Sequence, residues 1–158
     1  MNTAAAPLRL HIQKALGARN RALTPSAAQL RAWAQAAVLP GKVCEATLRL
    51  VGAREGLQLN RDFRGRDYAT NVLTFVYDDL PAAAPICGDI ALCVPVVVRE
   101  AREQGKTLAA HFAHLLVHGM LHLQGFDHET PAEAEVMEAH EVEILAQLGF
   151  ADPYRAAA

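Results

Sequence analysis

One stretch of the chain stands out for its histidines: His118-Gly119-Met120-Leu121-His122-Leu123-Gln124-Gly125-Phe126-Asp127-His128. His118 and His122 are four residues apart in an apolar segment with helical spacing, so both imidazoles leave one face of a helix about one turn apart. Gly125 is expected to end this helix, because glycine accepts the left-handed conformation that a sharp turn needs. The chain can then fold back, and His128 can reach the same point as the first two histidines.

This spacing predicts a metal site formed by His118, His122 and His128. Three neutral imidazoles leave the fourth tetrahedral position for water, which is the arrangement of catalytic rather than structural zinc sites. Zinc would lower the pKa of that water to about 7. His114 is close to the same helical face, and we expect it to support the site rather than to bind the metal. The remaining histidines are expected to be structural or on the surface: His111, His140 and His11.

The same spacing matches the metzincin peptidase signature H-E-x-x-H-x-x-G-x-x-H at every place but the second. The chain has Gly119 there, where a peptidase has the glutamate that acts as general base. Without that carboxylate, a peptidase is the weaker interpretation of the site.

Hydrophobic periodicity predicts four strands and about five helices. The expected strands span residues 8–13, 44–51, 71–76 and 86–93. The expected helices run from Thr24-Pro25 towards Val38, over 54–60, 95–103 and 107–124, and from a capping box at Thr130 to just before Gly149. The last helix is expected to turn five side chains inward: Val136, Met137, His140, Ile144 and Leu148. This order predicts an α+β fold with one small mixed four-stranded sheet.

Composition favours one domain over residues 1–158, since 52% of the 158 residues are hydrophobic and 20% are charged. These values exclude a disordered or coiled-coil chain. The stretch 107–126 lacks Asp, Glu, Lys and Arg, but its four histidines favour a buried helix over a membrane span. Three cysteines without a CxxC motif, and no recognisable targeting signal, favour a reducing, cytoplasmic location.

Three blocks of the sequence resemble the YbeY family of bacterial metallo-endoribonucleases. The histidine stretch resembles the family motif H-G-x-L-H-L-x-G-Y-D-H, with Phe126 in place of the tyrosine. Leu59-Asn60, Arg64, Asp67 and the run 70–75 resemble L-N-x-x-[YF]-R-x-x-D-x-x-T-[DN]-V-L-[ST]-F, and 88–90 resembles its G-D-I strand. The resemblance covers roughly residues 45–148.

The resemblance implies a zincin-like α+β domain that acts as a zinc-dependent, single-strand-specific endoribonuclease. It implies maturation of the 3′ end of 16S rRNA and ribosome quality control, with the 16S rRNA precursor, the small ribosomal subunit and its proteins as partners, and neither a membrane nor DNA. It assigns the three histidines to zinc and Arg64 to catalysis or phosphate binding. Two alternatives stay open: a zincin-type hydrolase of another substrate, and a ribosome-assembly factor whose zinc is mainly structural.

The sequence does not identify the general base or the nucleophile. Asp127 or Asp89 could orient an imidazole, but neither is identified as the general base, and the nucleophile is either water or the 2′-hydroxyl of the RNA. Arg64 could instead be a surface arginine paired with Asp62 or Asp67. We expect Gly119 to leave room for a ribose-phosphate close to the metal.

Charge is unevenly distributed along the chain. Residues 1–44 carry six basic side chains and no acid, whereas 107–158 carry eight acids and only Arg155. We therefore expect RNA to enter over the basic segment, with Arg19 and Arg21 extended from a loop, and to pass Arg64 on its way to the zinc. The acidic helix after Thr130 is expected to face away from RNA.

Overall fold

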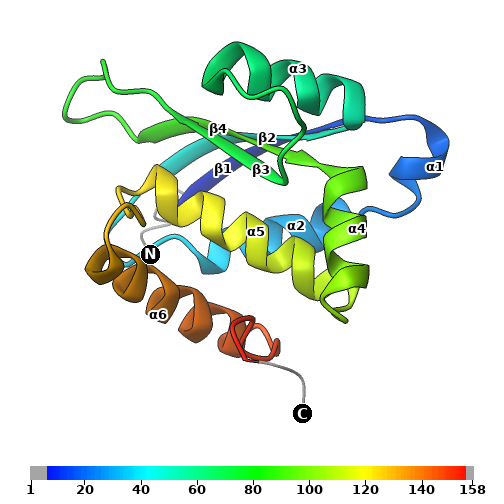
Figure 1. Ribbon diagram of the computed structural model, residues 1–158. Helices are drawn as coiled ribbons and strands as arrows, with labels where there is room; N and C mark the ends of the chain where they lie inside the picture. The colour runs from blue at the N-terminus through cyan, green and yellow to red at the C-terminus, as the bar shows by residue number, and fades with distance from the viewer. Residues whose placement is uncertain (1–6, 156–158) are drawn as a thin grey trace.

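A four-stranded sheet separates the helices into two groups (Figure 1). The computed structural model describes residues 7–155. The strands are β1 (Leu8–Ala15), β2 (Cys44–Val51), β3 (Val72–Val76) and β4 (Ile86–Cys93), in the spatial order β1-β2-β4-β3. The first two strands and β4 run parallel, whereas β3 is antiparallel to β4 and forms an edge. The predicted α+β class and its small mixed sheet are confirmed.

One face of the sheet is covered by α3 (Ala53–Arg64), and the other by α2 (Ala27–Ala36) and α5 (Leu108–Leu123) (Figure 1). Helix α6 (Pro131–Gln147) packs on α5, while α1 (Ala18–Arg21) follows β1 and α4 (Val94–Glu103) follows β4. The main core lies between the sheet and α5, where Phe112, Leu116 and Met120 are fully buried. Because α5 is covered from both sides, its polar side chains have to find partners on neighbouring elements.

The described residues contain six helices, where about five were expected. The additional helix is α1, in the segment expected to be a loop, and its four residues are too short to show a periodic pattern. The predicted start of α2 was wrong. Ser26, not Thr24, is its N-cap, because the Ser26 and Gln29 side chains each accept a hydrogen bond from the other's backbone N–H. The Thr24 hydroxyl instead donates a hydrogen bond to the Arg21 carbonyl, at 2.7 Å.

Helix α6 begins as predicted, with the Thr130 side chain accepting from the Glu133 N–H at 3.1 Å. Its buried stripe differs from the prediction. Val136 is 53% exposed, and the buried positions are Met137, Glu141, Ile144 and Leu145. A glutamate takes part in this stripe because its carboxylate finds hydrogen-bond donors on α5.

Within residues 7–155, no helix is both long enough and apolar enough to cross a membrane. The charge-free stretch forms α5, which has 16 residues and is enclosed by the sheet and α6.

Candidate metal centre

Three histidine side chains converge where α5 ends. We call His118, His122 and His128 the histidine triad. One ring nitrogen from each lies within 4.8 Å of the other two, a separation that one metal ion can bridge. His118 and His122 are on α5, and Gly125, with φ +102°, turns the chain so that His128 returns to them. Figure 1 shows this turn leading from α5 into α6.

The chemistry of the donor set fits a metal. The buried Glu141 carboxylate lies 2.8 Å from Nδ1 of His118, so this nitrogen carries a proton and donates a hydrogen bond to the carboxylate. Nε2 of His118 then carries no proton, and its lone pair is available to bind a metal. Burial, reinforced by the neighbouring His118 and His128, lowers the pKa of His122 and keeps its imidazole neutral, as metal binding requires.

Glu141 organises the residues behind the triad. It is fully buried, and it also accepts hydrogen bonds from Nε2 of His114, at 2.7 Å, and from the Tyr154 hydroxyl. Burial raises the pKa of Glu141, but the hydrogen bonds from His114, His118 and Tyr154 outweigh it and bring the pKa down to about 2. The carboxylate is therefore ionised at neutral pH and fixes the tautomer of His118.

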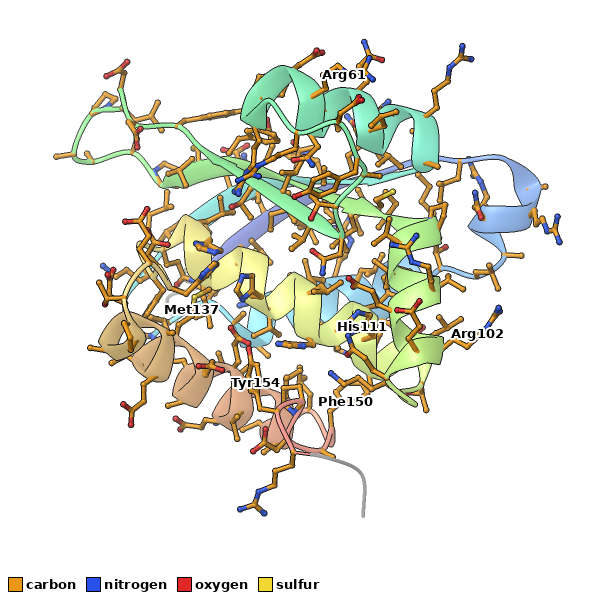
Figure 2. The ribbon with its side chains drawn as sticks, in the orientation of Figure 1. Arg61, Arg102, His111, Met137, Phe150 and Tyr154 are labelled. Carbon is orange, nitrogen blue, oxygen red and sulfur yellow. The ribbon has the colours of Figure 1, made fainter. Side chains whose placement is uncertain are left out.

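Tyr154 closes the site from the C-terminal side of α6. Figure 2 shows its side chain between α5 and α6. Burial and the hydrogen bond to Glu141 raise the pKa of Tyr154, so its phenol keeps its proton and remains a donor. His114 is thus tied to Glu141 and Tyr154, behind the triad.

The sequence did not point to Glu141 or to Tyr154. The detectable signal was the position of Glu141, a charged residue four positions after Met137 on an otherwise apolar helical stripe. The two aspartates considered for an orienting role have other partners. Asp127 accepts from the backbone N–H of His128, at 2.8 Å, and Asp89 accepts from the Tyr77 hydroxyl.

A cleft of about 450 Å³ opens over the triad. Arg64 lines it from the end of α3, together with Thr70 and Thr74 from the segment that leads into and through β3. Gly65, in the left-handed conformation with φ +66°, ends α3 directly after Arg64. Helix α3 is therefore one turn longer than the predicted 54–60, and this extra turn carries the arginine to the cleft.

Arg64 does not form the ion pairs that the sequence allowed. Asp67 pairs with Arg61 instead, and Figure 2 shows Arg61 on the outer side of α3. Within residues 7–155, no carboxylate lies within salt-bridge distance of Arg64. Its guanidinium is available to an anion in the cleft.

Gly119 faces the sheet and not the cleft, contrary to expectation. A Cβ atom at this position would lie 3.1 Å from Ile90 and 3.3 Å from Thr74. Glycine is needed because α5 crosses β4 and β3 closely here, so the space that it leaves is filled by the protein itself.

The part of the basic N-terminal segment that carries Arg19 and Arg21 lies away from the cleft. β1 and β3 form opposite edges of the sheet, and α1, with Arg19 and Arg21, extends beyond the far end of β1 (Figure 1). Arg21 donates to the Lys14 carbonyl, at 2.9 Å, and Lys14 donates to the Pro25 carbonyl, at 2.9 Å. These side chains hold local backbone, and their placement does not support the expected RNA path. The expectation that the acidic helix faces away from RNA was also wrong, because Met137 and Glu138 of α6 line the cleft.

Comparison with known proteins agrees with this arrangement. A family model described as endoribonuclease YbeY matches residues 16–149, which include the triad, Arg64 and Glu141. The chain belongs to the YbeY family. The matched residues begin directly after β1 and continue to just after α6, so they include every described helix and strand except β1.

Curated members of the YbeY family are similar over most of their length. An endoribonuclease YbeY of Aromatoleum aromaticum is 62% identical over 152 residues, covering 96% of each chain. One of Stenotrophomonas maltophilia is 57% identical over 141 residues, covering 85% of this chain and 87% of the relative. Among solved structures, the solution structure of TM1509 from Thermotoga maritima matches with a TM-score of 0.51 and 25% identity, covering 93% of this chain and 99% of the other.

Proposed function

We propose that this protein is a zinc-dependent endoribonuclease that cleaves single-stranded RNA, with the 16S rRNA precursor as its substrate. Its class, an RNA-cleaving hydrolase, follows from membership of the YbeY family. The observation that carries the proposal is the pairing of a three-histidine metal site with an unpaired arginine in one cleft.

Zinc, when bound by the histidine triad, supplies a Lewis acid for a phosphoryl oxygen and the means to make water more acidic. Three imidazole ligands suit zinc, and they leave a coordination position open. Glu141 stays ionised and accepts a hydrogen bond from Nδ1 of His118, which leaves Nε2 as the ring nitrogen that can bind the metal. Tyr154 and His114 satisfy the other oxygen of Glu141, which keeps this buried carboxylate in place.

Arg64 binds the phosphate from the opposite side of the cleft. Its planar guanidinium can donate two parallel hydrogen bonds to one phosphodiester. These bonds orient the phosphorus towards the triad and offset the charge that builds up on the phosphoryl oxygens during cleavage. We therefore assign Arg64 the catalytic role and the histidine triad the metal-binding role.

The size of the cleft supports a single strand as substrate. A volume of about 450 Å³ is in the range of sites for single small ligands, so it suits one nucleotide rather than a paired helix. A role in 16S rRNA maturation would bring the protein to the small ribosomal subunit, and we propose a cytoplasmic location for this reason. The exposed acidic side chains of α6 could contact a basic ribosomal protein there: Glu133, Glu135 and Glu143.

Digestion of RNA with and without a chelator tests the proposal. We expect the zinc-loaded protein to cleave a labelled single-stranded RNA, to spare the same sequence in a duplex, and to lose activity with chelator and regain it with added zinc. Arg64→Ala should bind zinc normally yet cleave poorly, whereas Arg102→Ala, a change at an exposed arginine of α4 outside the cleft lining, should cleave normally. Undiminished cleavage after complete removal of the metal would contradict a catalytic metal.

A 16S rRNA precursor with an unprocessed 3′ end is the second substrate to test. Shortening at this end by the zinc-loaded protein, and not by Arg64→Ala, would support the proposed substrate. Cleavage of generic RNA without processing of the precursor would limit the function to that of a general nuclease.

A further inference from the structure

Exposed hydrophobic side chains are concentrated in one segment of the chain, which also contributes residues to the cleft. Of the nine large hydrophobic side chains that are exposed among residues 7–155, five lie between positions 63 and 80: Phe63, Tyr68, Val76, Tyr77 and Leu80. They belong to the end of α3, to the loop after it, to β3 and to the segment that follows β3. The same segment supplies Arg64, Thr70 and Thr74 to the cleft, and exposed apolar surface next to a cleft is typical of a binding site.

Phe63 is the most exposed of these five side chains. The residue is 64% exposed, although its ring makes an edge-to-face contact with Phe75 of β3, with ring centroids 4.9 Å apart and an angle of 62° between the rings. This contact supports Phe63 from one side and leaves most of the ring in water. An aromatic ring held in this way is preorganised to receive a flat partner.

Phe63 lies next to the cleft in the chain. Phe63 directly precedes Arg64, the arginine that lines the cleft. Phe75 and Thr74 are neighbours on β3 and point to opposite faces of the sheet, Phe75 towards α3 and Thr74 towards Gly119 of α5. The edge of β3 therefore separates the cleft from the Phe63–Phe75 pair, and a strand of RNA that leaves the cleft past Arg64 reaches Phe63 next.

The segment 61–80 carries four aspartates and three arginines, so its net charge does not attract a polyanion, and the binding groups for phosphate are individual arginines. Arg64 and Arg66 are exposed and have no carboxylate within salt-bridge distance among residues 7–155. Aromatic rings interspersed with unpaired arginines fit a single nucleic-acid strand, whose bases stack on the rings while its phosphates bind the guanidinium groups.

We propose that Phe63, supported by Phe75, is a stacking site for one RNA base, next to the nucleotide whose phosphate Arg64 binds. This inference rests on the proposed function and specifies how that function selects its substrate. A base in a duplex is already paired and stacked between its neighbours, so it cannot reach Phe63 without unstacking. The stacking site thus gives a physical reason for cleavage of single strands.

Removal of the ring, and removal of the base, test the same contact. We would compare the wild-type protein with Phe63→Ala and Phe63→Trp, using a single-stranded RNA that carries an abasic nucleotide at each position around the cleavage site in turn. Leu23→Ala is the matched control, because Leu23 is an exposed hydrophobic residue directly after α1 and away from the cleft. Phe63 is largely exposed, so the alanine variant should fold normally.

We expect Phe63→Ala to raise the KM for intact RNA by about 5- to 100-fold, the range for loss of one stacked base. The abasic nucleotide should raise the KM of the wild type to a similar degree at one position only, and should have little further effect in Phe63→Ala. Phe63→Trp should restore the wild-type KM. The salt dependence of binding should not change in Phe63→Ala, because no charge is removed. A 2-aminopurine at the sensitive position should lose fluorescence on binding to the wild type before cleavage, and should not do so with Phe63→Ala.

Two results would overturn the inference. One is a Phe63→Ala protein with wild-type KM and an unchanged response to abasic RNA. The other is a Phe63→Ala protein that has normal RNA kinetics but no longer self-associates in sedimentation. That result would identify the surface around Phe63 as a contact between two copies of the chain. In both cases the wild type still cleaves RNA, and the proposed function stands. A wild type that neither binds nor cleaves RNA would reject the proposed function together with the inference.

Discussion

Glu141→Gln would test how the buried network between α5 and α6 sets up the metal centre. Glutamate and glutamine have nearly the same shape, but the amide is neutral and has one acceptor oxygen in place of two. The carboxylate accepts from His118, His114 and Tyr154. A glutamine cannot accept all three hydrogen bonds. Its amide nitrogen is itself a donor, and it would lie against at least one of the three donor groups.

The size of the effect follows from the pKa of Glu141, which falls from its ordinary value of 4.5 to about 2. Each pKa unit corresponds to about 1.4 kcal/mol, so the network favours the ionised carboxylate by about 3 kcal/mol. This contribution is fully present above the ordinary pKa of 4.5 and is lost as the pH falls through about 2. We expect Glu141→Gln to lower the free energy of unfolding of the metal-free protein by about 1 to 3 kcal/mol at neutral pH.

Zinc affinity is the more specific measurement. Loss of the partner that orients a ligating histidine typically costs about 10- to 100-fold in metal affinity, and we expect that range in a competition with a chromogenic chelator. Glu135→Gln removes a carboxylate from an exposed position of the same helix and should leave both quantities unchanged. Wild-type zinc affinity in a folded Glu141→Gln protein would show that the His118 orientation does not depend on this carboxylate.

Other predictions follow from the same geometry. Alanine at any one residue of the histidine triad should remove most of the bound zinc in elemental analysis, whereas His114→Ala should retain it. Full zinc occupancy in any single triad variant would exclude a three-histidine site. Gly119→Glu should not produce a peptidase, and it should lower the thermal midpoint, because its Cβ atom would already lie 3.1 Å from Ile90; casein digestion by this variant would refute the reasoning. Arg64→Lys should keep zinc and lose most RNA cleavage, since a lysine cannot donate the paired hydrogen bonds of a guanidinium. Equal rates for Arg64→Lys and the wild type would indicate that only the charge matters.

The sequence was most informative where a local rule decides the structure. The spacing of His118 and His122 depends only on the helical repeat, and Gly125 depends only on its access to the left-handed conformation, which the structure has at φ +102°. The same applies to the alternating strands and to the cap at Thr130, because each is determined by residues close together in the chain. The start of α2 was misplaced because Thr24 and Ser26 are both good N-caps, and only the partner Gln29 distinguishes them.

Tertiary structure decided what depends on residues far apart in sequence. Glu141 lies 23 positions from His118, and nothing near it in the chain explains a charge on a buried helical stripe until α5 brings two imidazoles to it. The sequence around Gly119 does not show why a glycine is needed there. The structure does, because α5 crosses the sheet so closely that Ile90 and Thr74 occupy the space next to its Cα atom. The positive charge of the basic segment was clear from the sequence, but the location of its strand was not. The order of the strands in the sheet puts β1 at the edge opposite β3. Local conformational preferences specify which groups are available, whereas packing specifies which of them meet.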